Sequence, residues 1–281
     1  MVVLASAVAV LAISCSRQRS SEASAGPPIP AGPLMTTNIG FGFAIHYLPV
    51  PKADPSAALA KLLKDRFTNM QHVARLDSVE AGIAVSSELF TNAQQTHPPP
   101  SLESLTYFGR GLTREQAVAL QSSSTVFLLA FGYPSNHVWS GMYSALQLTE
   151  ALAQQTGGII WDVETREAFG IEAWHSKRLK TWTAATTPNI ADHTTMHAYN
   201  KGQFARAITL GMAKFGLPDI VIDDFAWSLN RNMGHLINLF AQALAEGVQT
   251  SGPRPWGGST KIADHRQGRR LCTCDGRSQC C

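Results

Sequence analysis

The sequence predicts an α+β fold in which a mainly antiparallel sheet has helices packed on one face. Two observations predict it. First, the segments 158–169 and 193–212 are each typical of a β-hairpin, and both lie next to predicted helices. Second, the predicted elements follow in the order strand, helix, strand, helix, hairpin, helix, hairpin, strand, helix. Hairpins beside helices favour an α+β arrangement.

The N-terminal half begins with a predicted strand and a predicted helix. Residues 38–50 alternate apolar and small or polar side chains and end at two prolines, which is typical of a strand. Asp54 is a suitable N-cap, and Pro55 suits the first turn of the helix that follows. The apolar residues of this helix recur at helical spacing: Leu59, Leu62, Leu63 and Phe67.

Three shorter elements are expected next. Residues 79–89 and 107–110 are each typical of a short strand. Thr113 and Gln116 have the spacing of a capping box, which predicts a helix that extends to about residue 121.

The central segment gives the strongest signals. Residues 124–131 form a continuous apolar run of strand length, which predicts a buried central strand. A helix is expected over 137–155, ended by Gly157 and Gly158. Its predicted core residues are Val138, Met142, Leu146, Leu148 and Leu152.

The first hairpin, 158–169, has its predicted turn at 163–165, and a helix with Trp174 and Leu179 inward is expected over 171–182. The second hairpin turns at 200–202, where a glycine supplies the positive φ that the turn needs. The charged residues around the first turn are expected to be solvated: Asp162, Glu164, Arg166 and Glu167.

A strand over 219–225 and a last helix that ends at Ala245 complete the domain. Ser228 or Asn230 is expected to cap this helix, and Gly247 follows its end. Its predicted core face consists of Leu236, Ile237, Phe240 and Leu244.

Composition limits the class of protein. The chain has 281 residues, of which 44% are hydrophobic and 15% charged, with a formal net charge of +3. The low charge and the lack of a basic stripe exclude a nucleic-acid partner. Residues 39–248 are expected to form the α+β domain, with a sub-boundary near 95–101, and no motif in it calls for a cofactor.

The two ends differ from this domain. Residues 1–15 are almost uncharged and apolar, which is typical of a signal peptide, and 16–38 have the composition of a flexible linker. The tail 249–281 is basic and contains four cysteines, but their spacing lacks the paired C-x2-C knuckles of a zinc site. We expect a disordered tail without a metal.

The residues before Cys15 resemble the lipobox of bacterial lipoproteins, in which the Cys is lipidated and becomes the mature N-terminus. This resemblance implies export, with lipid on Cys15 as the means of membrane association. An ordinary cleaved signal peptide is the alternative, and an intracellular protein of unknown function is another.

A second resemblance covers part of the region 126–247, through the segments FLLAFGYP, TGGIIWDVETREAF, LGMAKFGLPDIVIDDF and MGHLINLFAQALAEG. These segments resemble an uncharacterised family of bacterial envelope or lipoprotein-type proteins. The resemblance implies a bacterial domain and supplies no activity, cofactor or catalytic residue.

Four residues are candidates for catalysis. Asp223 and Asp224 close a predicted strand, where a carboxylate can act as a general base. His193 and His197 share a face of a predicted strand about 13 Å apart, too far to hold one metal ion together. A hydrolase that pairs one of these acids with one of these histidines is therefore one interpretation.

Two other sets are candidates for ligand binding. Ser135, Asn136 and His137 lie between the best predicted strand and the best predicted helix, where free backbone N–H groups can bind an anion. Arg231 and His235 lie one helical turn apart and could face one pocket. The leading interpretation remains an exported protein with a non-catalytic binding or assembly role in the cell envelope.

Overall fold

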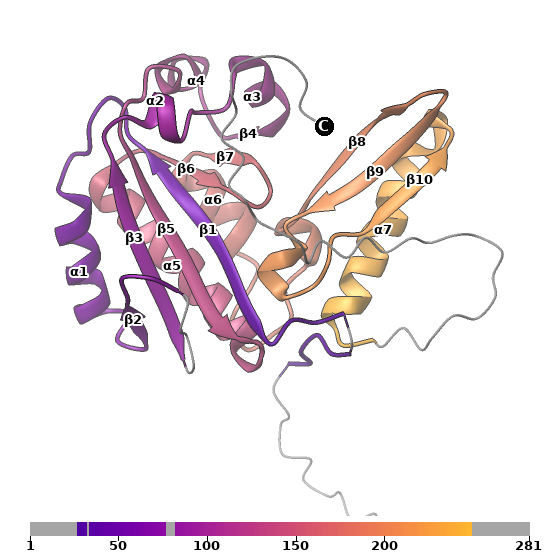
Figure 1. Cartoon of the computed structure of the whole chain (residues 1–281), viewed down its shortest axis with the longest axis horizontal. Helices are drawn as coiled ribbons and strands as arrows, with labels where there is room; N and C mark the ends of the chain where they lie inside the picture. The colour runs from indigo at the N-terminus through magenta and orange to yellow at the C-terminus, as the bar shows by residue number, and fades with distance from the viewer. Residues whose placement is uncertain (1–26, 33, 77–81, 249–281) are drawn as a thin grey trace, which may run out of the picture.

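The computed structural model describes residues 27–32, 34–76 and 82–248, which form two sheets with helices around them (Figure 1). The predicted α+β fold is confirmed. Residues 1–15 with Cys15, most of 16–38 and the tail 249–281 lie outside the described residues, so the expected signal peptide, linker and disordered tail stay predictions.

The larger sheet has seven strands in the order β2-β3-β5-β1-β6-β7-β4. Their bounds are β1 (Asn38–His46), β2 (Met70–His72), β3 (Ile83–Phe90), β4 (Gly109–Arg110), β5 (Val126–Pro134), β6 (Ile159–Asp162) and β7 (Glu167–Phe169). The central pairs are antiparallel, but β2 pairs with β3 and β4 pairs with β7 in parallel. The sheet is therefore mixed, because its two short edge strands join through longer connections instead of hairpin turns.

Helices cover both faces of this sheet to different extents (Figure 1). The long helices α1 (Pro55–Asp65) and α5 (Val138–Thr156), together with α6 (Ile171–Trp174), pack on the face that holds the main core. The short helices α2 (Ala93–Thr96), α3 (Leu102–Phe108) and α4 (Arg114–Leu120) gather at one end. Here Ala93 packs against Ala44 and Val126 on the opposite face, so the helices are not confined to one face.

The smaller sheet has the order β10-β9-β8 and packs against α7. Its elements are β8 (Thr195–Lys201), β9 (Phe204–Leu210), β10 (Val221–Phe225) and α7 (Asn230–Ala245). The remaining elements are the 3-10 helices η1 (Ser135–His137), η3 (Ile190–Asp192), η4 (Met212–Phe215) and η5 (Trp227–Leu229) and the π-helix η2 (His175–Leu179). Phe215 of η4 and Ala241 of α7 belong to the same apolar cluster as the strands of the larger sheet. The strands of the smaller sheet contribute to a separate cluster around Ala205, Ala207, Phe225 and Ile237.

Local signals predicted several elements correctly. Asp54 caps α1 by accepting a hydrogen bond from the Ser56 N–H at 2.9 Å, and Thr113 forms the expected capping box with Gln116. The predicted strand at 107–110 is largely wrong. Ser101 caps helix α3, which extends to Phe108, so only Gly109 and Arg110 remain as strand.

The predicted core face of the last helix is wrong in part. Ile237 is buried, but Leu236 is 38% exposed and Phe240 is 52% exposed. The helix instead buries three small residues beside Ile237: Gly234, Ala241 and Ala245. Small residues let α7 approach β9, whose inward residues Ala205 and Ala207 are also small. Close packing on the sheet therefore turns the large apolar side chains outward.

Candidate functional site: a buried charged network

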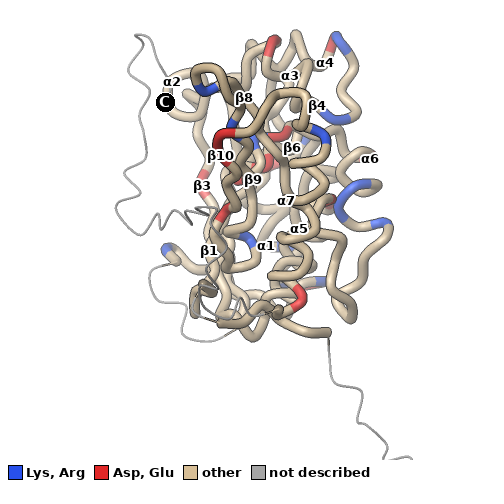
Figure 2. The backbone as a smooth tube through the Cα atoms, turned by 90° about the vertical axis from the view of Figure 1, so that its right-hand side faces the viewer, with Lys and Arg blue, Asp and Glu red and all other residues tan. Residues whose placement is uncertain are grey.

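Four charged side chains meet in the interior, and each is fully buried. They are Asp162 at the end of β6, Glu167 at the start of β7, Arg178 in η2 and Lys214 in η4. Figure 2 shows residues of both signs around β6. A group of buried charges needs close ion pairs and hydrogen bonds, because desolvation of each ion costs several kcal/mol.

Arg178 is the centre of this network. Its Nη2 donates to Asp162 Oδ2 and to Glu167 Oε2, both at 2.9 Å. Its Nη1 donates to the main-chain carbonyl of Asp192. Lys214 Nζ donates to the same Asp162 oxygen at 2.6 Å. The guanidinium thus joins the β6–β7 hairpin to η3, while Lys214 joins the hairpin to η4.

Two further cations lie at the rim. Arg110 Nε donates to Glu167 Oε1 at 2.8 Å, and Lys177 Nζ donates to the same oxygen at 2.9 Å. Burial by itself would raise the pKa of Glu167, but Arg178, Lys177 and Arg110 together lower it to about 2. Burial lowers the pKa of Lys214 to about 8 against the opposing effect of Asp162.

The local backbone positions these side chains. Asp162 Oδ1 accepts from the N–H groups of Glu164 and Thr165 at 3.1 and 3.2 Å, which closes the hairpin turn. Arg166 completes the turn with a positive φ of 59°. On the other side, the π-helical turn of η2 carries Lys177 and Arg178, both of which bond to Glu167. Such turns are rare and often occur at functional sites.

An aromatic layer encloses the network. The Arg178 guanidinium lies over the rings of Phe169 and Trp174, 4.8 and 5.8 Å from their centroids. These contacts add cation–π stabilisation where the charge is desolvated. The network is sealed from solvent at its centre, so it ties elements together and offers no open position for a substrate.

The two histidines proposed for catalysis lie in aromatic surroundings. His193 is buried against Trp182 and Phe215, with ring centroids 5.1 and 6.2 Å away. Burial, followed by the nearby cations of the network, holds the pKa of His193 well below its usual value. His197 stacks on Phe108 at 4.5 Å. His193 is thus a neutral core residue that precedes β8, not a residue at the surface.

The proposed acids lie elsewhere. Asp223 of β10 forms ion pairs with Arg206 of the neighbouring strand β9 at 3.4 Å and with Lys201 at the end of β8 at 3.5 Å. Asp224 is exposed and has a positive φ of 60°. These ion pairs engage the carboxylate of Asp223 with cations. Among the described residues, the structure does not bring Asp223 or Asp224 to His193 or His197 as a catalytic pair.

The other candidate residues are separate from one another. Ser135, Asn136 and His137 form η1 between β5 and α5, and Ser135 donates its backbone N–H to the Thr37 carbonyl. Arg231 and His235 are exposed on α7. The first set therefore belongs to the turn that begins α5, and the second belongs to the exposed side of α7.

The network differs from the solvated turn that was expected around Asp162 and Glu167. The alternation of side chains along the two strands could have predicted that both carboxylates are buried. Asp162 shares a face with Ile160, and Glu167 shares a face with Phe169, because residues two apart on a strand point the same way. Ile160 and Phe169 both face the main core, so both carboxylates point inward.

An apolar cavity of about 470 Å³ lies between α3 and α4. Its lining consists of Leu102, Leu105, Thr106, Gly109, Leu112, Thr113, Arg114, Ala117 and Val118. This lining has no histidine, carboxylate or thiol, so it lacks a general base that could activate the hydroxyl of Thr106 or Thr113.

Two further properties concern the described residues alone. Within 27–32, 34–76 and 82–248, no group of three or more His, Cys, Asp or Glu side chains is arranged to hold a metal ion. No helix in these ranges combines the length and the apolar character that a membrane span needs.

Buried histidines should make the protein less stable in acid. Burial, and secondarily His97, lowers the pKa of His46 from 6.5 to about 4. Between pH 6.5 and pH 4 the unfolded chain therefore binds a proton at His46 more readily than the folded chain does. The free energy of unfolding is unaffected by His46 above pH 6.5 and decreases as the pH falls towards 4. We expect His46 alone to reduce the free energy of unfolding by about 2 kcal/mol between pH 7 and pH 5.

Urea denaturation at the two pH values measures this loss. The variant His46→Leu should show a pH dependence smaller by the same amount, while His193 continues to act in the same direction. An identical pH dependence in both proteins would contradict the assignment.

Comparison with known proteins gives no relative. No protein-family model, no curated protein and no solved structure matches the chain.

Proposed function

We propose that this chain is an exported bacterial protein with a non-catalytic binding or assembly role in the cell envelope. One observation carries the binding role: the outward apolar surface of η5 and α7. We call it the α7 outer face, and it consists of Trp227, Leu229, Leu236, Leu239 and Phe240.

The spacing of these residues makes the surface continuous along the helix. Leu229, Leu236 and Phe240 are separated by seven and four residues, which places them on one side. Leu239 is the most exposed, at 69%, and Phe240 is beside it. Isolated exposed apolar residues are common, but a row of large ones marks an interaction surface.

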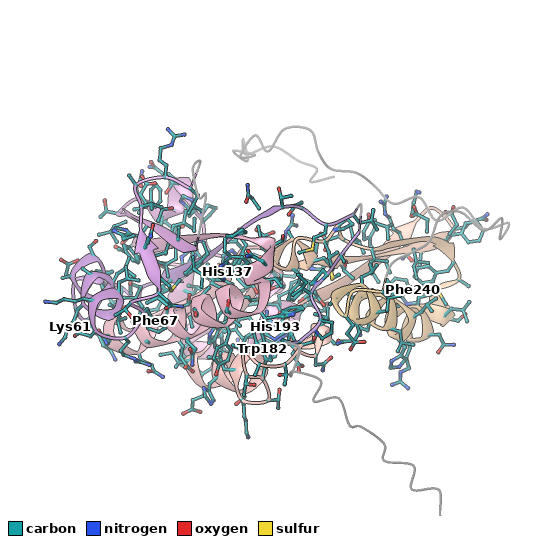
Figure 3. All side chains as sticks on the ribbon, turned by 90° about the horizontal axis from the view of Figure 1, so that it is seen from below. Lys61, Phe67, His137, Trp182, His193 and Phe240 are labelled. Atoms are coloured by element: carbon teal, nitrogen blue, oxygen red, sulfur yellow. The ribbon has the colours of Figure 1, made fainter. Side chains whose placement is uncertain are left out.

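Charges are sparse along this surface. Arg231 is the one Lys, Arg, Asp or Glu residue within α7, and Figure 2 shows the helix on the side that faces the viewer. Figure 3 shows Phe240 on α7, at the other end of the molecule from Lys61 on α1. The surface thus lies away from α1, and its chemistry suits contact with another apolar surface.

The buried charged network supports a binding role over a catalytic one. Its four central side chains are fully buried and are already bonded to one another. The ion pairs with Lys201 and Arg206 likewise occupy Asp223, one of the two acid candidates. A protein that acts by binding needs a rigid scaffold with an exposed surface, and these features suit that role.

The proposed location depends on the sequence of 1–15. Palmitate labelling in a bacterial host should mark the chain, and Cys15→Ala should abolish the label if the cysteine carries the lipid. Recovery of the unlabelled chain in the cytosol with Met1 intact would contradict export.

The binding role can be tested by photo-crosslinking in the same host. A benzophenone amino acid in place of Phe240 should give a discrete crosslinked product, because the ring is 52% exposed on the proposed surface. The matched control replaces Tyr107, which is 67% exposed on α3. Equal, weak crosslinking at the two positions would contradict a binding surface on α7.

A further inference from the structure

We infer that the rim of the buried charged network binds a phosphate group through Arg110 and Lys177. This site is separate from the α7 outer face and does not depend on the binding role proposed for that face. It lies at the outer end of the network, where the two side chains are 34% and 27% exposed, and not at the sealed centre.

Cations outnumber acids in and around the first hairpin. Residues 159–169 contain one cation, Arg166, and three acids: Asp162, Glu164 and Glu167. Four further cations bond to the carboxylates of this hairpin: Arg110, Lys177, Arg178 and Lys214. Five cations therefore accompany three acids, which leaves an excess of two positive charges in this group.

The excess is greatest at the outer end of Glu167. On the buried side, its Oε2 accepts from Arg178 at 2.9 Å. On the outer side, its Oε1 accepts from Arg110 at 2.8 Å and from Lys177 at 2.9 Å. Two cations thus share one carboxylate oxygen at the rim, and one oxygen cannot neutralise both of them.

Both rim cations retain donors for an anion. A lysine has three N–H donors, and Glu167 accepts one from Lys177. Arg110 uses Nε for Glu167 and Nη1 for the carbonyl of Tyr107, each at 2.8 Å, which leaves Nη2. Among the residues that the structure describes, no other acceptor bonds to either side chain. Because both cations reach the same oxygen, one anion can contact the free donors of both.

The backbone fixes the position of these cations. β4 pairs in parallel with β7, which places Arg110 opposite Phe169, and the Arg110 carbonyl accepts from the Gly170 N–H at 2.9 Å. Lys177 Nζ lies 5.9 Å from the centroid of the Phe169 ring. The two donors are therefore held in place before an anion arrives, which lowers the entropic cost of binding.

The electrostatic surroundings of Lys177 agree with an excess of positive charge. Burial, followed by Arg178 and to a smaller extent Arg110, lowers the pKa of Lys177. Among the described residues, Glu167 is the one acid that opposes this shift. An anion at the rim would raise the pKa of Lys177 towards its usual value, because a negative charge favours the protonated amine.

The charge and the donors together favour a phosphate group over a carboxylate. A phosphate dianion matches the excess of two positive charges, whereas a carboxylate supplies one negative charge. Its tetrahedral oxygens can accept from Arg110 Nη2 and from Lys177 Nζ at the same time. Arg and Lys are also the side chains that most often bind phosphate in proteins.

Titration of the full chain with inorganic phosphate tests this site, at about pH 7.5 and a constant ionic strength of about 0.2 M. The measurement is the NMR signal of the Arg110 Nε–H group. We expect a saturable shift with a Kd in the millimolar range, since two charge-assisted bonds hold the anion. Sulfate, which is also divalent and tetrahedral, should bind similarly, and acetate should bind at least about fivefold more weakly.

The variant Lys177→Gln removes one rim cation and should weaken phosphate binding at least about fivefold. Arg110 and Arg178 still bond to Glu167 in this variant, so the protein should remain folded. Circular dichroism and urea denaturation check this.

The smaller sheet supplies a matched control. Lys201 and Arg206 also share one carboxylate oxygen, Asp223 Oδ1, at 3.5 and 3.4 Å. Asp224 is adjacent, so acids and cations are equal in number there. Lys201→Gln should therefore leave the affinity for phosphate unchanged, and the signal of Arg206 Nε–H should move little.

Saturable binding of phosphate and sulfate that Lys177→Gln weakens and Lys201→Gln does not would support the inference. A shift that does not saturate, an equal response to acetate, or equal affinity of the Lys177→Gln and unaltered proteins would overturn it. If Lys177→Gln does not fold, the comparison of phosphate with acetate on the unaltered chain decides. Methyl phosphate then identifies the source of the group, because tighter binding than inorganic phosphate indicates a phosphorylated small molecule and weaker binding indicates the free ion.

Discussion

Arg178→Met is expected to lower the free energy of unfolding by about 3–5 kcal/mol, because it removes one cation from a buried network. Asp162 and Glu167 would each lose a bond of 2.9 Å, and the carbonyl of Asp192 would lose its donor. Met fills much of the same volume, so the loss measures charge and hydrogen bonding more than packing. Urea denaturation at pH 7 gives the value.

An exposed ion pair supplies the matched control. Lys201→Met removes one of the two cationic partners of Asp223, at 3.5 Å, but the Lys201 side chain is 51% exposed. Exposed pairs contribute at most about 1 kcal/mol, so this variant should unfold almost as the unaltered protein does. Equal effects of the two variants would show that Arg178 does not stabilise the interior.

Gly141→Ala is expected to cost about 3 kcal/mol, although alanine is the better helix former. A Cβ at Gly141 would lie 2.4 Å from Cδ1 of Tyr133 and 2.7 Å from two other atoms of the ring. The ring cannot move easily, because it is buried and its hydroxyl donates to the Lys214 carbonyl at 3.1 Å. The helix or the ring must therefore shift.

Gly234→Ala is the comparison for this variant. Its Cβ would meet only the end of the Met196 side chain, at 3.0 and 3.2 Å, and that side chain is flexible. The gain in helix propensity should offset this contact, which leaves the free energy of unfolding within about 1 kcal/mol of its original value. Thermal or urea unfolding of both variants tests the contrast, and a stable Gly141→Ala protein would contradict it.

Elements whose structure depends on neighbouring residues could be predicted from the sequence. The cap at Asp54, the capping box at Thr113 and the apolar spacing of α5 all follow from interactions within a few residues. The strand over Val126–Pro134 follows from its apolar length. These signals identify elements without reference to the rest of the fold.

Prediction failed where distant contacts decide between two local possibilities. Both sides of α7 contain apolar residues, and the approach of the helix to Ala205 and Ala207 selects the side with Gly234 and Ala241. The buried position of Asp162 likewise depends on a lysine of η4, 52 residues later in the chain. The cations that neutralise the first hairpin lie outside it, and the local pattern does not show that they are adjacent.

The distribution of the buried charges along the chain has a consequence for how the protein unfolds. Asp162 and Glu167 belong to the larger sheet, whereas Lys214 lies between the second and third strands of the smaller one. If the smaller sheet detached alone, Asp162 would lose its shortest ion pair. The two sheets should therefore open together, as a single cooperative unit with similar protection against amide hydrogen exchange.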